Sequence, residues 1–256
     1  MSSSNHPVIL IVPGAFGTPA GFDKLAPHLD GLQTHPGAYP SCNHPDPLNA
    51  TCAADITAVR SIILSLLDQQ RDVVILAHSY GGVVAGGAAK DLDRETRKAQ
   101  DHSSAVVGLV YIAGNITLEG ETLFEAVGGA YPPFIKEHTP SEGFALIRPA
   151  MDVLYNDCDP ALQPAFDASV QPHALKAFET KPPAPAWADK GFDGRRLYVR
   201  TLDDHCNPSF LQDAWIQKSK VDWEVVDFKT GHMPFVSQPE ALGAQIVRFV
   251  WRLGQF

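Results

Sequence analysis

Val73-Val74-Ile75-Leu76-Ala77-His78-Ser79-Tyr80-Gly81-Gly82 is the stretch of sequence that decides the fold. Its first half is a run of apolar residues, which is typical of a strand buried on both faces of a parallel sheet. A segment rich in Gly and Ala follows over 81–89 and is predicted to be a helix. Ser79 therefore lies at a tight turn from strand to helix, where crowded backbone requires small neighbours such as Ala77 and Gly81. The pattern predicts an exposed nucleophilic serine, with Ala77 in place of the first glycine of G-x-S-x-G.

Further apolar runs and helical patterns surround this stretch. The runs at 8–12, 106–112, 197–201 and 223–228 predict strands, and the apolar spacing over 55–70 predicts a helix. Ser237-Gln238-Pro239-Glu240 predicts a capping box that begins a final helix reaching about residue 253. Strands that alternate with helices predict the α/β class, with a mainly parallel central sheet flanked by helices. We expect residues 1–256 to form a single domain.

Residues 116–194 interrupt this alternation. They hold ten of the chain's 21 prolines, and proline at this density cannot continue a regular sheet. They also contain nine aromatic residues that need burial: Phe124, Tyr131, Phe134, Phe144, Tyr155, Phe166, Phe178, Trp187 and Phe192. We predict that 116–194 is an inserted lid over a pocket; the alternative is a loop-rich surface excursion.

Composition excludes several classes of partner. The chain has 20 Lys+Arg against 29 Asp+Glu and no basic cluster, which disfavours nucleic acid. It has no apolar run of membrane-spanning length, and residues 1–7 lack the features of a signal peptide, so a cytoplasmic location without membrane contact is expected. Four cysteines are too few for a disulfide scaffold, although a Cys42–Cys52 bridge remains an open alternative.

A nucleophilic Ser79 needs hydrogen-bond donors that stabilise an oxyanion. The Tyr80 backbone N–H at the start of the helix is one candidate donor. The loop after the first strand, 12–17, supplies Ala15 N–H as the other, with Phe16 next. A dinucleotide-binding turn is a rival interpretation of this loop, but the glycine spacing does not fit G-x-G-x-x-G.

A serine nucleophile also needs a base and an acid. His232 lies after the last predicted strand and before the final helix, where the histidine falls in the chain order Ser, Asp, His. The acid is expected after the strand at 197–201, where either Asp203 or Asp204 can orient the imidazole. Phe16, His78, Tyr80 and Met233, which adjoin these positions, are the predicted substrate-binding residues. No motif for a metal or a nucleotide is present, so neither a metal nor a cofactor is expected.

On these motifs the chain resembles α/β-hydrolase-fold proteins, in particular the branch of methyl-salicylate-type esterases and hydroxynitrile lyases, with related fungal and bacterial hydrolases. In that branch the acid stands four residues before a proline and eight before a glutamine. Asp204, Pro208 and Gln212 match this spacing, so the resemblance favours Asp204 over Asp203. The family's H-G-A loop corresponds to Pro13-Gly14-Ala15, so its histidine is lost here. Lyases of this branch carry Thr at Gly14 and Lys at Met233, and both differences favour an esterase.

The sequence thus predicts a serine hydrolase that cleaves an ester or lactone of a small, mostly apolar or aromatic molecule through an acyl-enzyme. One alternative uses the same site for non-hydrolytic chemistry, such as carbon–carbon cleavage, elimination or cyclisation. Another is a non-catalytic ligand-binding member of the fold. The expected partner is a small-molecule substrate, and the sequence carries no signal for oligomeric state.

Overall fold

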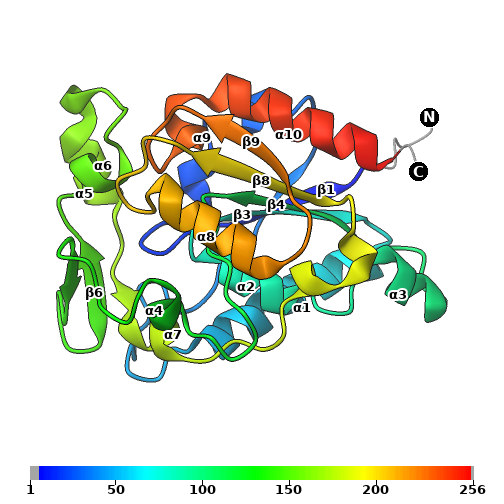
Figure 1. Cartoon of the computed structure of the whole chain (residues 1–256), viewed down its shortest axis with the longest axis horizontal. Helices are drawn as coiled ribbons and strands as arrows, with labels where there is room; N and C mark the ends of the chain where they lie inside the picture. The colour runs from blue at the N-terminus through cyan, green and yellow to red at the C-terminus, as the bar shows by residue number, and fades with distance from the viewer. Residues whose placement is uncertain (1–5, 255–256) are drawn as a thin grey trace.

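A computed structural model describes residues 6–254 of the chain. Its centre is a six-stranded sheet in the order β2-β1-β3-β4-β8-β9, and all neighbouring strands run parallel (Figure 1). The strands are β1 (Val8–Val12), β2 (Thr34–Pro36), β3 (Val73–His78), β4 (Val106–Ile112), β8 (Arg196–Thr201) and β9 (Glu224–Phe228). The predicted α/β fold with a mainly parallel sheet is confirmed.

Burial explains why these segments form strands. Every residue of β1, β3 and β4 is buried, because helices cover both faces of the sheet at its centre. Continuous apolar runs satisfy both faces at once, which is why the sequence predicted these three strands. The edge strand β9 instead alternates between half-buried and exposed residues.

Helices cover the sheet on two sides (Figure 1). On one side lie α1 (Cys52–Asp68) and α2 (Gly81–Ala88), which pack closely because Gly87 leaves room for Ile56. On the other side lies α10 (Pro239–Leu253), which approaches β4 where Gly108 has no side chain. The remaining helices outside the 116–194 region are α3 (Arg94–Ala99), α8 (Ser209–Ser219) and α9 (Pro234–Ser237), with 3-10 helices η1 (Pro19–Phe22) and η2 (Ala26–His28).

Most of residues 116–194, called the inserted segment below, lies beyond the carboxyl ends of the central strands, whereas its last part, 186–194, packs against α2 and α3 before β8 begins (Figure 1). They form a small antiparallel sheet in the order β5-β6-β7, separate from the central sheet. The elements are α4 (Leu123–Ala126), β5 (Ile135–Glu137), β6 (Phe144–Ile147), α5 (Ala150–Leu154), η3 (Pro160–Leu162), α6 (Gln163–Ser169), β7 (His173–Ala174), α7 (Leu175–Glu179), η4 (Ala186–Ala188) and η5 (Lys190–Phe192). The prolines therefore exclude these residues from the central sheet but permit short strands between them.

Backbone hydrogen bonds tie the inserted segment to loops of the central domain. Gln171 N donates to Phe16 O at 2.9 Å, and Ala174 N donates to Ser41 O at 3.0 Å. Cys42 and His173 also form an isolated antiparallel bridge. The inserted segment is thus held against the loops that follow the first two strands of the sheet.

Two details of the sequence analysis change. The predicted capping box at Ser237–Glu240 is wrong: Ser237 ends α9, and Gln238 precedes α10 without a side-chain cap. Ser237 cannot cap α10 because it is the last residue of α9, which Pro234 begins directly after His232 and Met233. Cys42 and Cys52 are both free thiols, so the structure contains no bridge between them.

Among residues 6–254, no helix combines the length and apolarity that crossing a bilayer requires.

Candidate active site

Ser79 lies on a strained turn at the carboxyl end of β3. Its φ is +50°, a conformation that residues with a side chain rarely adopt. Three backbone hydrogen bonds hold the turn: Ser79 N donates to Ile112 O, while Gly82 N and Asn115 N donate to Ser79 O. Ser79 remains 9% exposed, although the strand before it is buried throughout. The predicted strand-to-helix turn is present, and hydrogen bonds to Gly82 on one side and to Ile112 and Asn115 on the other hold its strained backbone in place.

The loop 13–17 packs directly against this turn. A Cβ added at Gly14 would lie 2.9 Å from Ser79 Cβ, so only glycine permits this approach. Tyr39 Oη is 2.9 Å and 2.8 Å from the carbonyl oxygens of Pro13 and Gly14, and its hydroxyl donates to them. Phe16 has a φ of +64°, a second strained residue beside the serine. The loop that was predicted to supply Ala15 and Phe16 therefore lies next to Ser79.

Asp204 and His232 form a buried hydrogen-bonded pair. His232 Nδ1 lies 2.7 Å from Asp204 Oδ2, and both side chains are almost fully buried. Asp203, the alternative acid, is exposed, and the hydrogen bonds of the structure involve its backbone. The structure thus brings Asp204, and not Asp203, to His232.

Four donors surround the Asp204 carboxylate. Oδ2 accepts from Thr201 Oγ1 and His232 Nδ1, while Oδ1 accepts from the backbone N–H groups of Cys206 and Asn207. Gln212 stabilises the loop from behind, because its amide bonds both backbone groups of Thr201 as well as Asn207 O. This clamp is a physical reason for a glutamine eight residues after Asp204.

The charge of Asp204 controls the protonation of His232. Burial by itself lowers the pKa of His232, but the negative charge of Asp204 and then the neighbouring Cys206 outweigh it, so the pKa is raised above its usual value. The pair therefore favours an imidazolium at His232. A proton taken up there is stabilised, which is what a general base beside a serine requires.

His78 links His232 to the serine turn. Its Nε2 donates to His232 O at 2.9 Å, and the two rings lie 4.5 Å apart between centroids. Burial lowers the pKa of His78, and the nearby His232 lowers it further, so His78 is a neutral donor. Within residues 6–254, no hydrogen bond joins the Ser79 hydroxyl to His232.

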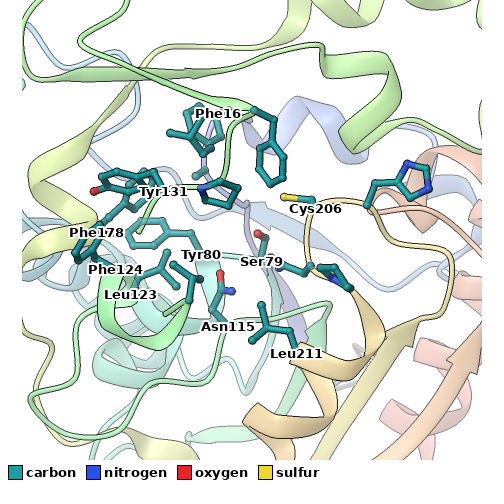
Figure 2. A pocket seen from close by; sticks show the side chains of 18 residues that line it. Phe16, Ser79, Tyr80, Asn115, Leu123, Phe124, Tyr131, Phe178, Cys206 and Leu211 are labelled. Carbon is teal, nitrogen blue, oxygen red and sulfur yellow. The ribbon is translucent and has the colours of Figure 1, made fainter. Parts of the chain in front are cut away.

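Two cavities open beside these residues. The serine cavity, of about 250 Å³, is lined by Ser79 and by apolar side chains that include Phe16, Tyr80, Phe124, Tyr131, Phe178 and Leu211 (Figure 2). The histidine cavity, of about 340 Å³, is lined by His78 and Met233, with Phe16, Tyr155, Ser169 and Gln171 among the others. Each predicted substrate-binding residue lines at least one of the two cavities.

Sequence reasoning missed part of the serine cavity wall. Asn115, His205, Cys206 and Leu211 line it (Figure 2 labels all except His205), and none was singled out. A usable signal was present, because loops at the carboxyl ends of neighbouring parallel strands meet at one edge of a sheet. Asn115 follows β4, and 205–206 follow β8. Within the described part of the chain, no cluster of His, Cys, Asp and Glu is arranged to hold a metal ion.

Comparison with known proteins places this chain in a family. The model of the "Alpha/beta hydrolase family" matches residues 9–245. The chain therefore belongs to the α/β-hydrolase family, as its resemblance indicated.

Several known proteins are similar to this chain over most of its length. Alpha/beta hydrolase nvfD of Aspergillus novofumigatus is 27% identical over 239 residues, covering 91% of this chain and 92% of that protein. A pyrethroid hydrolase of Sphingobium wenxiniae is 23% identical over 255 residues, covering 94% and 86%. The crystal structure of methylesterase MES16 from Arabidopsis has the same fold, with a TM-score of 0.72 at 16% identity, covering 96% and 99%. The relatives in sequence are thus hydrolases, and a methylesterase shares the fold of the chain.

Proposed function

We propose that this chain is a serine esterase that hydrolyses an ester or lactone of a small, mostly apolar or aromatic molecule. The observation that carries the proposal is the buried Asp204–His232 pair beside the strained turn of Ser79. The apolar cavity that opens at Ser79 supports an apolar substrate. Names of relatives, such as the carbendazim hydrolyzing esterase of Nocardioides sp., support the reaction class.

The proposed mechanism has two steps. His232 Nε2 takes the proton of Ser79 Oγ, which attacks the carbonyl carbon, and the protonated imidazole then donates to the departing alcohol oxygen. Water, deprotonated by the same imidazole, attacks the acyl carbon, and the imidazole returns the proton to Ser79 Oγ as its bond to that carbon breaks. Asp204 holds the imidazole through Nδ1 and stabilises its positive charge. The backbone N–H groups of Tyr80 and Ala15, or Phe16, hold the oxyanion, and each such donor contributes about 10²- to 10³-fold in rate.

We further propose that the inserted segment 116–194 acts as a lid. Phe124, Tyr131 and Phe178, all from this segment, face the serine cavity (Figure 2). They exclude water from one side of Ser79, which strengthens the electrostatic interactions there. Phe178 is buried, and Phe124 and Tyr131 are half-buried, which favours a lid over a surface excursion.

Fluorophosphonate labelling followed by intact-mass analysis tests the nucleophile. We expect one adduct on the wild type, none on Ser79→Ala, and one on Ser61→Ala, whose serine lies exposed on α1. Ester hydrolysis by Ser79→Ala is expected to fall by several orders of magnitude, roughly 10⁶-fold. A Ser79→Ala variant that retained more than a tenth of the activity would refute the assignment.

The non-hydrolytic alternative is separated by the fate of water. Hydrolysis in H₂¹⁸O incorporates one labelled oxygen into the released acid, whereas elimination or cyclisation incorporates none. We expect incorporation, because the acyl-serine proposed here can be released only by attack of an outside nucleophile.

A further inference from the structure

Phe16 stands between the two cavities of the site. It lines both the serine cavity and the histidine cavity, and among the residues that the structure describes only Ala15 does the same. Its ring lies 6.0 Å from that of Phe178 and 5.7 Å from that of His173, centroid to centroid. Its carbonyl accepts from Gln171 N, so the inserted segment holds it in place. A molecule that fills both cavities must pass this side chain.

The walls of the two cavities differ in chemistry. Around Ser79 the serine cavity is lined mainly by aromatic and aliphatic side chains. The histidine cavity adds hydrogen-bonding side chains, namely Thr18, Ser169, Gln171 and the neutral His78. The first therefore suits an apolar group, and the second suits a group that carries hydroxyl or carbonyl oxygens.

The proposed chemistry assigns a direction to each part of an ester. Ser79 Oγ forms a bond to the carbonyl carbon, so the acyl part stays attached to Ser79 while the bond to the alcohol oxygen breaks. That oxygen receives its proton from His232, so the alcohol must lie beside His232 when it leaves. Met233 follows His232 in the chain, and His78 packs on the His232 ring; both line the histidine cavity.

We propose that the histidine cavity is the alcohol site and that Phe16 sets its size limit. The inferred substrate is an ester that joins an apolar or aromatic acid, held in the serine cavity, to an alcohol larger than methanol. This inference rests on the proposed serine-esterase function. It goes beyond that function because it names a second site and the part of the substrate that occupies it.

The test uses two series of esters on each variant. In the alcohol series the acid is benzoic acid and the alcohol is methyl or benzyl; in the acyl series the alcohol is methyl and the acid is acetic or benzoic. Ratios of kcat/KM within one variant cancel any general loss of activity. Ser169→Phe fills the histidine cavity from an exposed position on α6, and Leu211→Phe fills the serine cavity from half-buried α8.

We expect Ser169→Phe to lower the benzyl-to-methyl ratio at least about tenfold, the range for one misfitted group in a pocket. Leu211→Phe is expected to lower the benzoate-to-acetate ratio instead. Phe16→Ala is expected to raise the benzyl-to-methyl ratio, and Phe16→Leu to raise it less. Melting curves identify any variant that has lost its fold. Ser169→Phe tests the histidine cavity without altering Phe16, whose backbone is strained.

Three outcomes overturn the inference. If Ser169→Phe and Phe16→Ala label fully with fluorophosphonate but leave the alcohol ratio unchanged, the histidine cavity is not the alcohol site, and the esterase function stands. If Ser169→Phe changes the acyl ratio instead, the two parts of the ester are reversed. Absence of any adduct on the wild type refutes the esterase function itself, and the alcohol site with it.

Discussion

Replacing Gly81 by alanine is expected to damage both stability and activity, because the turn at Ser79 leaves no room for one methyl group. A Cβ at position 81 would lie 2.4 Å from Val12 O and 2.5 Å from Pro13 O. Ordinary van der Waals contact begins near 3.4 Å, and both oxygens belong to backbone that cannot rotate away. One element must therefore move by about 1 Å, since strained insertions of this kind are not absorbed by a close-packed interior.

The expected cost is about 3 kcal/mol in the free energy of unfolding, at the upper end for overpacking a core. For a chain of this size that corresponds to a fall in Tm of roughly 6–12 °C. The displaced loop carries Ala15, the proposed oxyanion donor, two residues after Pro13. A shift of about 1 Å there is expected to lower kcat about 10²-fold.

Gly86→Ala on the same helix is the matched control. Its added Cβ meets Pro185 Cβ at 3.3 Å, which a small adjustment of side chains relieves, and alanine has the better helix propensity by about 1 kcal/mol. We expect its Tm to stay within a few degrees of the wild type and its activity to be unchanged. Thermal unfolding and ester kinetics on both variants provide the measurement. A Gly81→Ala protein as stable and active as Gly86→Ala would refute the steric reasoning.

Three further predictions concern titration, a buried carboxylate and the thiols. The kcat/KM of ester hydrolysis should rise with pH, with a midpoint above 6.5, because His232 must be neutral to act as the base and its pKa is raised. Asp204→Asn should lower this midpoint and cut kcat about 10⁴-fold. A midpoint unchanged in Asp204→Asn would contradict the pairing of Asp204 with His232. Asp55→Ala should lower the free energy of unfolding in urea by at least about 3 kcal/mol, because it removes the acceptor of the Ser41 N–H and of the Ser41 and Tyr80 hydroxyls. The control Asp68→Ala, at the exposed end of α1, should lower it by under about 0.5 kcal/mol. Equal losses of stability in the two variants would contradict this reasoning. Denatured, unreduced protein should titrate four free thiols, and two would indicate a bridge.

The central strands could be predicted because their signal is local. The run at 106–112 matches β4 at both ends, and the run at 73–77 is one residue shorter than β3. A strand buried on both faces must be apolar at every position, so no information from elsewhere in the chain is required. The edge strand β2 was missed, since it has three residues, ends in proline and is largely exposed.

The order of Ser79, Asp204 and His232 along the chain could also be predicted, since each follows a strand of one parallel sheet and their loops meet at one edge. The choice between Asp203 and Asp204 depended on resemblance alone. The two aspartates are adjacent in the chain, and only the turn after β8 decides which carboxylate is buried on His232 and which is exposed.

The sequence by itself determined the class of the fold, the strained turn at Ser79 and the candidate partners of that serine, because periodicity and small residues at a turn act over a few positions. The tertiary structure alone decided which side chains complete the walls of the two cavities beyond Phe16, His78, Tyr80 and Met233. Phe16, Phe178 and Leu211 are far apart in the chain and meet only when the inserted segment packs against the sheet edge. Which side chains face one space depends on this long-range packing, and no local pattern encodes it.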